Sequence, residues 1–129
     1  MAIELETHKL IANMAPQDYI SVILPTRQRI EPCIKSVMTM VETAQHPGKV
    51  EFVMVWDDDD RHTAEATMEK LSPKLKDAGV NRFSAHTIPR RGYERLNEYV
   101  TWGAKQSVGQ WIIFWNDDAV MNTFNWDTE

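Results

Sequence analysis

Two short acidic runs are the part of this sequence best suited to chemistry. Residues 57–60 are four consecutive aspartates, and Asn116, Asp117 and Asp118 directly follow the apolar run 111–115. Adjacent carboxylates repel each other and are costly to desolvate, so a bound cation is the simplest compensation. Mg²⁺ and Mn²⁺ prefer oxygen ligands and usually take one or two protein carboxylates when a substrate brings phosphates. The pair Asp117 and Asp118 is therefore a candidate metal site.

Arginines are the second group with a chemical use. Arg27 and Arg29 follow one apolar segment, and Arg90 and Arg91 follow another. A guanidinium group can bind phosphate through two parallel hydrogen bonds. The acidic runs and the arginines also have an interpretation that involves no ligand. Acids at a helix N-terminus suit the helix dipole, and most arginines are solvated surface residues. Arginines and acids on one rim fit a phosphorylated ligand that is bound together with a metal ion.

Alternating strands and helices must position these residues. Apolar, often β-branched runs predict strands over residues 19–24, 52–56, 82–88 and 111–115. A helix is expected from Glu31 until residues 45–48 stop it, and a second from about Thr63 with an interruption near Pro73. A third follows Gly92, with apolar residues at helical spacing: Tyr93, Leu96, Val100 and Ala104.

The strands predict the architecture. Strands that are apolar throughout, 111–115 included, are expected to be buried on both faces, as in parallel sheets. We predict an α/β fold, a three-layer α/β/α sandwich with a mainly parallel, Rossmann-like sheet, formed by one domain over residues 1–129. Ligands bind beyond the carboxyl ends of such strands, where residues 25–29, 57–62 and 116–120 are expected to lie.

Composition narrows the class of protein. The 129 residues are 43% hydrophobic and 26% charged, which is typical of one ordinary globular domain. The net charge of −5 argues against general binding to nucleic acid or acidic lipid. There is no apolar run long enough to span a membrane, and the start of the sequence is not expected to be a signal peptide, because it has early acids and no apolar core. Cys33, the only cysteine, is expected to be an inert buried thiol. A cytoplasmic location fits these features.

Several familiar site motifs are absent from the sequence. It contains no GxGxxG, no GxxxxGK[ST], no GxSxG and no HExxH pattern. These absences remove the usual dinucleotide-binding, P-loop, serine-hydrolase and zinc-protease interpretations.

Three segments together resemble nucleotide-sugar glycosyltransferases of the GT-A fold, specifically family 2. ISVILPTRQR looks like the opening strand and turn of that family, and EFVMVWDDDD looks like its second strand, which ends in paired acids. Residues 103–118 follow its spacing of helix, glycine, aromatic residue and acidic DXD motif, with Asn116 in the first acidic position. Each motif alone is degenerate, but three in the same order over residues 20–122 are fairly specific.

The resemblance implies a role for each matching residue at the first two strands. Pro25, Thr26 and Arg27 match the loop that holds the base and ribose of the donor. Asp57, in preference to Asp58, matches the acid that pairs with uracil N3–H.

The remaining matches concern the diphosphate and the metal ion. Arg90 matches a basic residue that contacts the nucleotide, and Arg29 shares the same rim. Asn116 and Asp117 match positions near the ribose and the metal, and Asp118 matches the direct metal ligand, with Asp117 beside it. The implied cofactor is Mn²⁺ or Mg²⁺.

The implied reaction is inverting hexosyl transfer from a UDP-sugar to an unknown hydroxyl acceptor, with the metal stabilising the leaving diphosphate. Family members continue with a part that holds the acceptor site and the general base, whereas this sequence ends at Glu129. We therefore expect that part to be missing or minimal, assign no catalytic residue, and expect donor hydrolysis as a residual activity. The alternative is a non-catalytic nucleotide or nucleotide-sugar binding domain.

Three other classes fit less well. A receiver domain would carry its acid pair after the first strand, where this chain has PTRQR. A DxDx[TV] phosphatase would need Thr or Val at Arg61. A sugar nucleotidyltransferase would usually carry a glycine-rich loop after the first strand. A homo-oligomer stays open.

Overall fold

Four parallel strands form one sheet in the computed structural model, which describes residues 19–128. The strands are β1 (Ile20–Pro25), β2 (Val50–Asp57), β3 (Arg82–Ile88) and β4 (Trp111–Phe114), in the spatial order β3-β2-β1-β4. Every neighbouring pair is parallel. The predicted parallel α/β sheet is confirmed, and the strand bounds lie close to the predicted segments.

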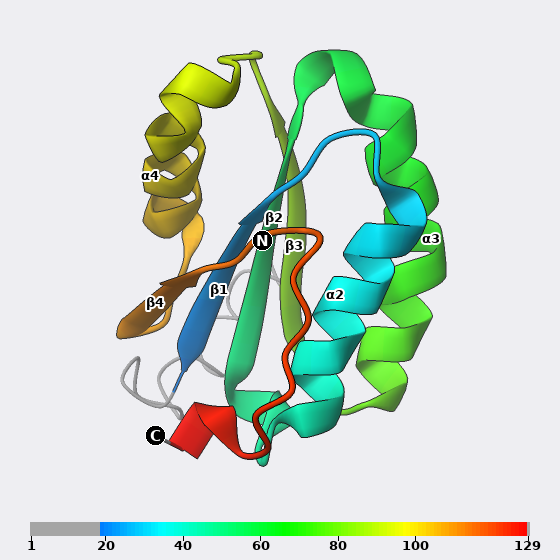
Figure 1. Ribbon diagram of the computed structural model, residues 1–129, viewed down its shortest axis with the longest axis vertical. Helices are drawn as coiled ribbons and strands as arrows, with labels where there is room; N and C mark the ends of the chain where they lie inside the picture. Colours follow the sequence, from blue (N-terminus) through cyan, green and yellow to red (C-terminus); the bar gives the residue numbers. More distant parts are fainter. Residues whose placement is uncertain (1–18, 129) are drawn as a thin grey trace, which may run out of the picture.

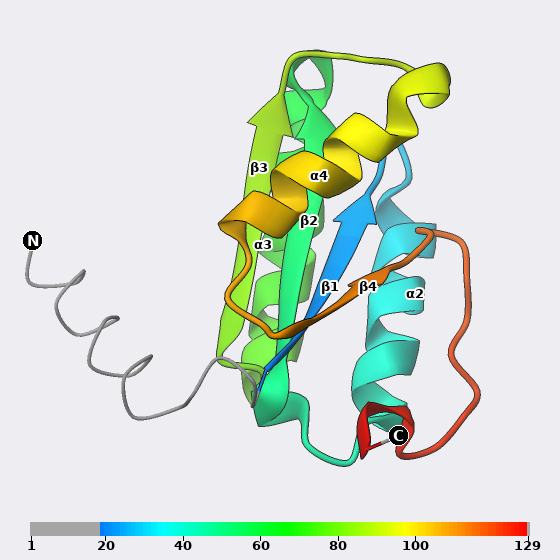
Figure 2. The ribbon, with the colours of Figure 1, turned by 90° about the vertical axis from the view of Figure 1, so that its left-hand side faces the viewer.

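Helices cover both faces of this sheet (Figures 1 and 2). Helices α2 (Ile30–Thr43) and α3 (Arg61–Asp77) pack on one face, and α4 (Leu96–Gln106) packs on the other. Short 3₁₀ turns complete the connections: η2 (Pro47–Lys49), η3 (Asp58–Asp60), η4 (Tyr93–Arg95) and η5 (Trp126–Thr128). The three-layer α/β/α sandwich is therefore confirmed.

The core is divided by the sheet. Residues alternate between the two faces along β1 and β2. Leu24 and Trp56 face α2 and α3, whereas the residues directly before them, Ile23 and Val55, face α4. All four side chains are at least 99% buried. The central strands are thus apolar on both faces, as the sequence predicts, because each face is covered by a helix.

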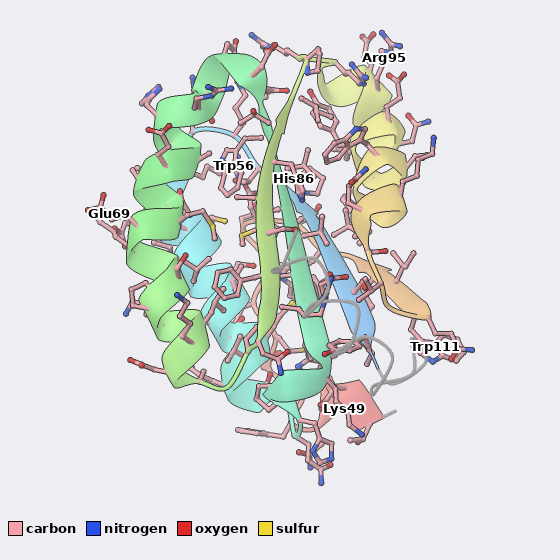
Figure 3. The ribbon with its side chains drawn as sticks, turned by 180° about the vertical axis from the view of Figure 1, so that it is seen from behind. Lys49, Trp56, Glu69, His86, Arg95 and Trp111 are labelled. Carbon is pink, nitrogen blue, oxygen red and sulfur yellow. The ribbon has the colours of Figure 1, made fainter. Side chains whose placement is uncertain are left out.

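The prediction that the fourth strand is deeply buried is wrong. Among residues 19–128, β4 pairs only with β1 and forms one edge of the sheet. The exposed fractions are 64% for Trp111, 47% for Ile112 and 42% for Phe114, and Trp111 lies at the rim of the molecule (Figure 3). An apolar run has the same appearance in a central strand and in an edge strand, so the pattern alone does not distinguish them.

The predicted interruption of the second helix near Pro73 is also wrong. α3 runs from Arg61 to Asp77 with Pro73 inside it. Pro73 lies on the exposed face, where water can satisfy the carbonyl that loses its intrahelical partner. Leu71 and Leu75, which flank it, are fully buried and hold the helix against the sheet.

The face of α4 differs from the predicted face as well. The buried residues of this helix are Tyr99 and Gly103, whereas the expected spacing placed Val100 and Ala104 inward. A Cβ on Gly103 would lie 2.5 Å from the Ile23 side chain, so the absence of a side chain lets α4 approach β1 closely. This rotation of the helix turns Tyr99 toward the carboxyl ends of the strands.

Two smaller expectations concern the burial of Cys33 and the length of the apolar helices. Cys33 is fully buried, and burial, with a smaller effect of Asp117, raises the pKa of its thiol to about 12. Among residues 19–128, no helix is long and apolar enough to cross a membrane.

Candidate functional site

A cleft of about 410 Å³ lies where β1, β2 and β4 end. Its lining comes from the loops that follow these strands, from the loop after β3 and from one face of α4. The lining residues are Pro25, Thr26, Arg27, Gln28, Arg29, Asp57, Arg90, Gly92, Leu96, Tyr99, Phe114, Asn116 and Asp117. The cleft is therefore at the sheet edge where parallel α/β folds bind ligands.

The loop between β1 and α2 turns sharply at Gln28. Its backbone has a φ of 55°, which non-glycine residues seldom adopt. The buried Asp60 holds this turn, because its Oδ2 accepts a hydrogen bond of 2.8 Å from the Gln28 amide. The turn separates Arg27 from Arg29, and the two arginines reach acids of different strands.

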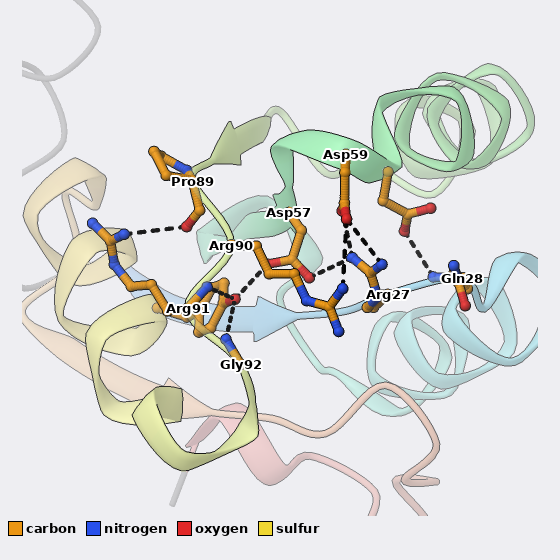
Figure 4. Close-up of polar contacts among 10 residues, drawn as sticks. Arg27, Gln28, Asp57, Asp59, Pro89, Arg90, Arg91 and Gly92 are labelled. Atoms are coloured by element: carbon orange, nitrogen blue, oxygen red, sulfur yellow. Dashed lines mark hydrogen bonds and ion pairs between the residues drawn. The ribbon is translucent and has the colours of Figure 1, made fainter.

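Arg27 is bound to two acids at the carboxyl end of β2, Asp57 and Asp59 (Figure 4). Its Nη1 lies 2.7 Å from Asp57 Oδ2 and 2.5 Å from Asp59 Oδ1. Arg90 adds a longer ion pair of 3.6 Å to Asp59. The hydrogen bond from Arg27 is the main cause that lowers the pKa of Asp59 below its ordinary value. Arg27 and Arg90 thus both lie beside Asp59, and this pairing favours its charged form.

Asp57 and Asp60 are the two buried acids of the four, and Asp57 is the one that lines the cleft, with only 5% of its surface exposed. The Tyr99 hydroxyl donates a hydrogen bond to Asp57 Oδ1. The same hydroxyl accepts hydrogen bonds from the amides of Arg91, at 2.7 Å, and Gly92, at 3.2 Å. Burial, followed by the hydrogen bond to Asp57, raises the pKa of Tyr99 above its ordinary value.

The acids after β4 lie on the other side of the cleft. Thr26 Oγ1 donates a hydrogen bond of 2.6 Å to Asp117 Oδ2. Arg29 Nη1 lies 3.2 Å from Asp117 Oδ1 and 3.5 Å from Asp118 Oδ2. The side chain of Asp117 is 13% exposed and that of Asp118 is 66% exposed.

This loop is anchored to the core by backbone and tryptophan contacts. The Trp115 amide donates to the Ile23 carbonyl at 3.0 Å, which extends the pairing of β4 with β1. Trp115 Nε1 donates to Ser36 Oγ at 2.7 Å, and Ser36 in turn donates to the Asn116 carbonyl at 3.1 Å. The position of Asp117 is therefore set by α2 as well as by β4.

The donor set of this loop suits a cation only in part. Among the described residues, no group of three or more His, Cys, Asp or Glu side chains could hold a metal ion without other ligands. Asp117 and Asp118 fit a divalent ion that completes its shell with phosphate oxygens and water. In the structure, the guanidinium of Arg29 forms ion pairs with both of these carboxylates.

The structure brings most of the predicted site residues into one cleft. Pro25, Thr26, Arg27, Arg29, Asp57, Arg90, Asn116 and Asp117 all line it. Asp58 does not line it and is exposed in η3. Asp118 lines a neighbouring hollow of about 400 Å³ beside α2. The roles given to these residues stay predictions.

The sequence did not single out five residues of the lining: Gln28, Gly92, Leu96, Tyr99 and Phe114. Tyr99 carries the most polar contacts of these. A signal for it existed, because Leu96, Tyr99 and Gly103 share one helical face at spacings of three and four.

Comparison with known proteins identifies the fold. The sequence matches no protein-family model and no curated protein. The structure of a mannosyltransferase, PcManGT from Pyrobaculum calidifontis in complex with GDP-Man and Mn²⁺, matches with a TM-score of 0.67 and 17% identity, over 84% of this chain and 31% of that one. S. aureus TarS 1–349 matches with 0.59 and 18%, over 81% and 28%, and another S. aureus TarS structure with 0.58 and 17%, over 85% and 18%.

These identities establish the fold alone. The chain spans less than a third of the length of each of the three structures. The resemblance to glycosyltransferases of the GT-A type is thus confirmed for the fold, which is the α/β fold of part of those proteins.

Proposed function

We propose that this chain is the donor-binding part of a metal-dependent glycosyltransferase that uses a nucleoside diphosphate sugar. The observation that carries the proposal is the cleft at the carboxyl edge, which is lined by the buried Asp57, by Asp117 and by three arginines: Arg27, Arg29 and Arg90. Acids and arginines in one cleft complement a ligand that has both N–H donors and phosphates.

The nucleoside would lie against the end of β2. Asp57 accepts two hydrogen bonds within the protein, and a carboxylate has about four acceptor positions, so it can also accept from a base N–H. Pro25 and Thr26 form the adjoining wall of the cleft, against which the ribose would lie. Uracil has one ring N–H that can donate to this carboxylate, N3–H, and we propose UDP as the nucleotide. The GDP-Man in the PcManGT complex supports a nucleotide sugar in general.

The diphosphate would lie between the arginines and the acids after β4. Arg29 and Arg90 supply positive charge to phosphate oxygens. Asp117 and Asp118 would hold Mn²⁺ or Mg²⁺, and the Mn²⁺ in the PcManGT complex supports the use of a divalent ion in general. When bound, such an ion supplies Lewis-acid stabilisation of the leaving diphosphate.

The reaction itself is the further part of the proposal. We propose hexosyl transfer with inversion to a hydroxyl acceptor, as in family 2. A non-catalytic nucleotide-sugar binding domain is the second candidate, because the chain spans only 31% of PcManGT. The two candidates differ in turnover: release of UDP from a UDP-sugar with Mn²⁺ favours the enzyme, and binding without release favours the binding domain.

Calorimetric titration with UDP and with GDP, each with and without Mn²⁺, tests the binding site. We expect metal-dependent binding of UDP that is reduced at least about tenfold in Asp118→Asn, because the neutral amide is a poor ligand for a hard cation. Asp77→Asn, at the far end of α3, is the matched control and should bind as the unaltered chain does. Absence of binding of either nucleotide under both conditions contradicts the proposal.

A further inference from the structure

The hydroxyl of Tyr99 connects three segments that are distant in the sequence. It reaches from α4 to Asp57 at the end of β2 and to the amides of Arg91 and Gly92 in the loop between β3 and α4. Figure 4 shows Asp57, Arg91 and Gly92 converging on this point. A hydroxyl group can donate once and accept twice, so these three bonds use its full capacity.

The ring of Tyr99 makes this hydroxyl immobile. The side chain is 6% exposed and packs with Ile23, Val55 and Ile88 in the core between the sheet and α4. Because two dihedral angles define a tyrosine side chain, a packed ring fixes the position of its oxygen.

Asp57 is consequently held from two sides. Tyr99 binds Oδ1, and Arg27 Nη1 binds Oδ2 at 2.7 Å. Two donors from different elements fix both the position and the plane of the carboxylate. The acceptor positions that remain point in set directions, which is how a recognition group is pre-organised.

The second contact of the hydroxyl fixes the loop that carries Arg90. Residues 89–92 belong to no helix or strand, and Gly92 has a φ of 83°, a conformation that suits glycine. The Arg91 and Gly92 amides find their acceptor in Tyr99 and in no strand partner. The direction in which Arg90 leaves this loop therefore depends on the same oxygen.

We infer that Tyr99 is the positioning residue of the nucleotide site, which orients Asp57 toward the base and holds the loop of Arg90 toward the phosphates. The inference deepens the proposed function and rests on it. Tyr99 acts through Asp57 and the loop and need not touch the ligand.

Tyr99→Phe is the direct variant, because it keeps the ring and removes only the hydroxyl. With Mn²⁺ present, we expect its affinity for UDP to fall about tenfold, since one hydrogen bond to a charged group is lost. Tyr19→Phe is the matched control: Tyr19 is equally buried but precedes β1, at the opposite end of the sheet. Equal affinity in Tyr99→Phe and the unaltered chain overturns the inference.

A double-mutant cycle separates positioning from general structural support. If Tyr99 acts partly through Asp57, the effect of Tyr99→Phe on UDP affinity is smaller in an Asp57→Asn background, where only the contribution of the loop remains. A structural defect would instead weaken binding by the same factor in both backgrounds. Full additivity therefore overturns the inference.

Amide hydrogen exchange in the ligand-free chain tests the hydrogen bonds of the Arg91 and Gly92 amides to Tyr99 without any nucleotide. We expect the Arg91 and Gly92 amides to exchange at least about tenfold more slowly than unstructured amides, and to lose that protection in Tyr99→Phe. Absence of protection contradicts the hydrogen bonds between these amides and Tyr99 and overturns the inference. Protection combined with no nucleotide binding by the unaltered chain supports these hydrogen bonds and overturns the proposed function. The two failures are therefore distinguishable.

Discussion

Asp57 and Asp58 are neighbours in the sequence, but the fold gives them opposite environments. Asp57 is the last residue of β2 and points into the cleft between Arg27 and Tyr99, whereas Asp58 begins η3 and faces solvent. The preference for Asp57 could be read from alignment with the family motif. The contact with Tyr99 could not, because a helical pattern shifted by one residue assigns Tyr99 to another face.

The raised pKa of Tyr99 predicts a loss of stability in alkali. Burial and then Asp57 raise this pKa above 10.0, so the unfolded chain loses the phenolic proton first as the pH rises. The stabilising contribution is complete below about pH 10 and is lost as the pH rises through the folded-state pKa. As the pH rises from about 8 to about 11, the free energy of unfolding measured in urea should therefore fall less for Tyr99→Phe than for the unaltered chain. An equal loss in both chains contradicts this assignment.

The strands differ in how well the sequence predicts them. β1 and β2 were predictable with their burial, because each lies between two helical layers and is apolar on both faces. β4 was predictable as a strand but not as an edge, since its position depends on which strands lie beside it. Its exposed Trp111 and the buried Trp56 form a natural pair for testing the strand order.

Truncating each tryptophan measures that difference. Trp56→Ala should lower the free energy of unfolding by about 3–5 kcal/mol, because it leaves a cavity in the core. Trp111→Ala should change it by less than about 1 kcal/mol, as is usual for exposed positions. Chemical denaturation of both variants gives the comparison. Similar large losses would mean that the Trp111 side chain is covered and would contradict the exposed edge described for β4.

The amino end of the sheet carries a second buried polar network, remote from the cleft. Glu51 Oε1 accepts hydrogen bonds from Ser21 Oγ at 2.8 Å and from the Val108 amide at 2.9 Å, and Arg82 Nε lies 3.3 Å from Oε2. This carboxylate therefore ties the start of β2 to the loop that leads into β4.

Removing that carboxylate separates stability from binding. Glu51→Ala should destabilise the fold by about 3 kcal/mol, at the low end of the range for a broken buried pair because Arg82 is partly exposed. UDP affinity of the folded variant should change by less than about twofold, since distant sites act independently. A large loss of affinity at full folding would show that the two ends of the sheet are coupled.

The overall architecture was predictable because it depends on the alternation of elements and not on any one contact. The order of acidic and basic segments after the strands placed eight predicted residues at one edge. The alternation of elements does not predict the proposed nucleotide, acceptor or reaction, which would depend on contacts within the cleft and on parts of the larger matched structures that this chain does not span.

A crystal structure of the chain with UDP and Mn²⁺ tests the nucleotide site most directly. We expect the base against Asp57 at the end of β2, the diphosphate between Arg29 and Arg90, and the metal ion on Asp117 and Asp118. Nucleotide bound elsewhere, or a cleft that stays empty at saturating UDP and Mn²⁺, would contradict the proposed site and leave only the shared fold.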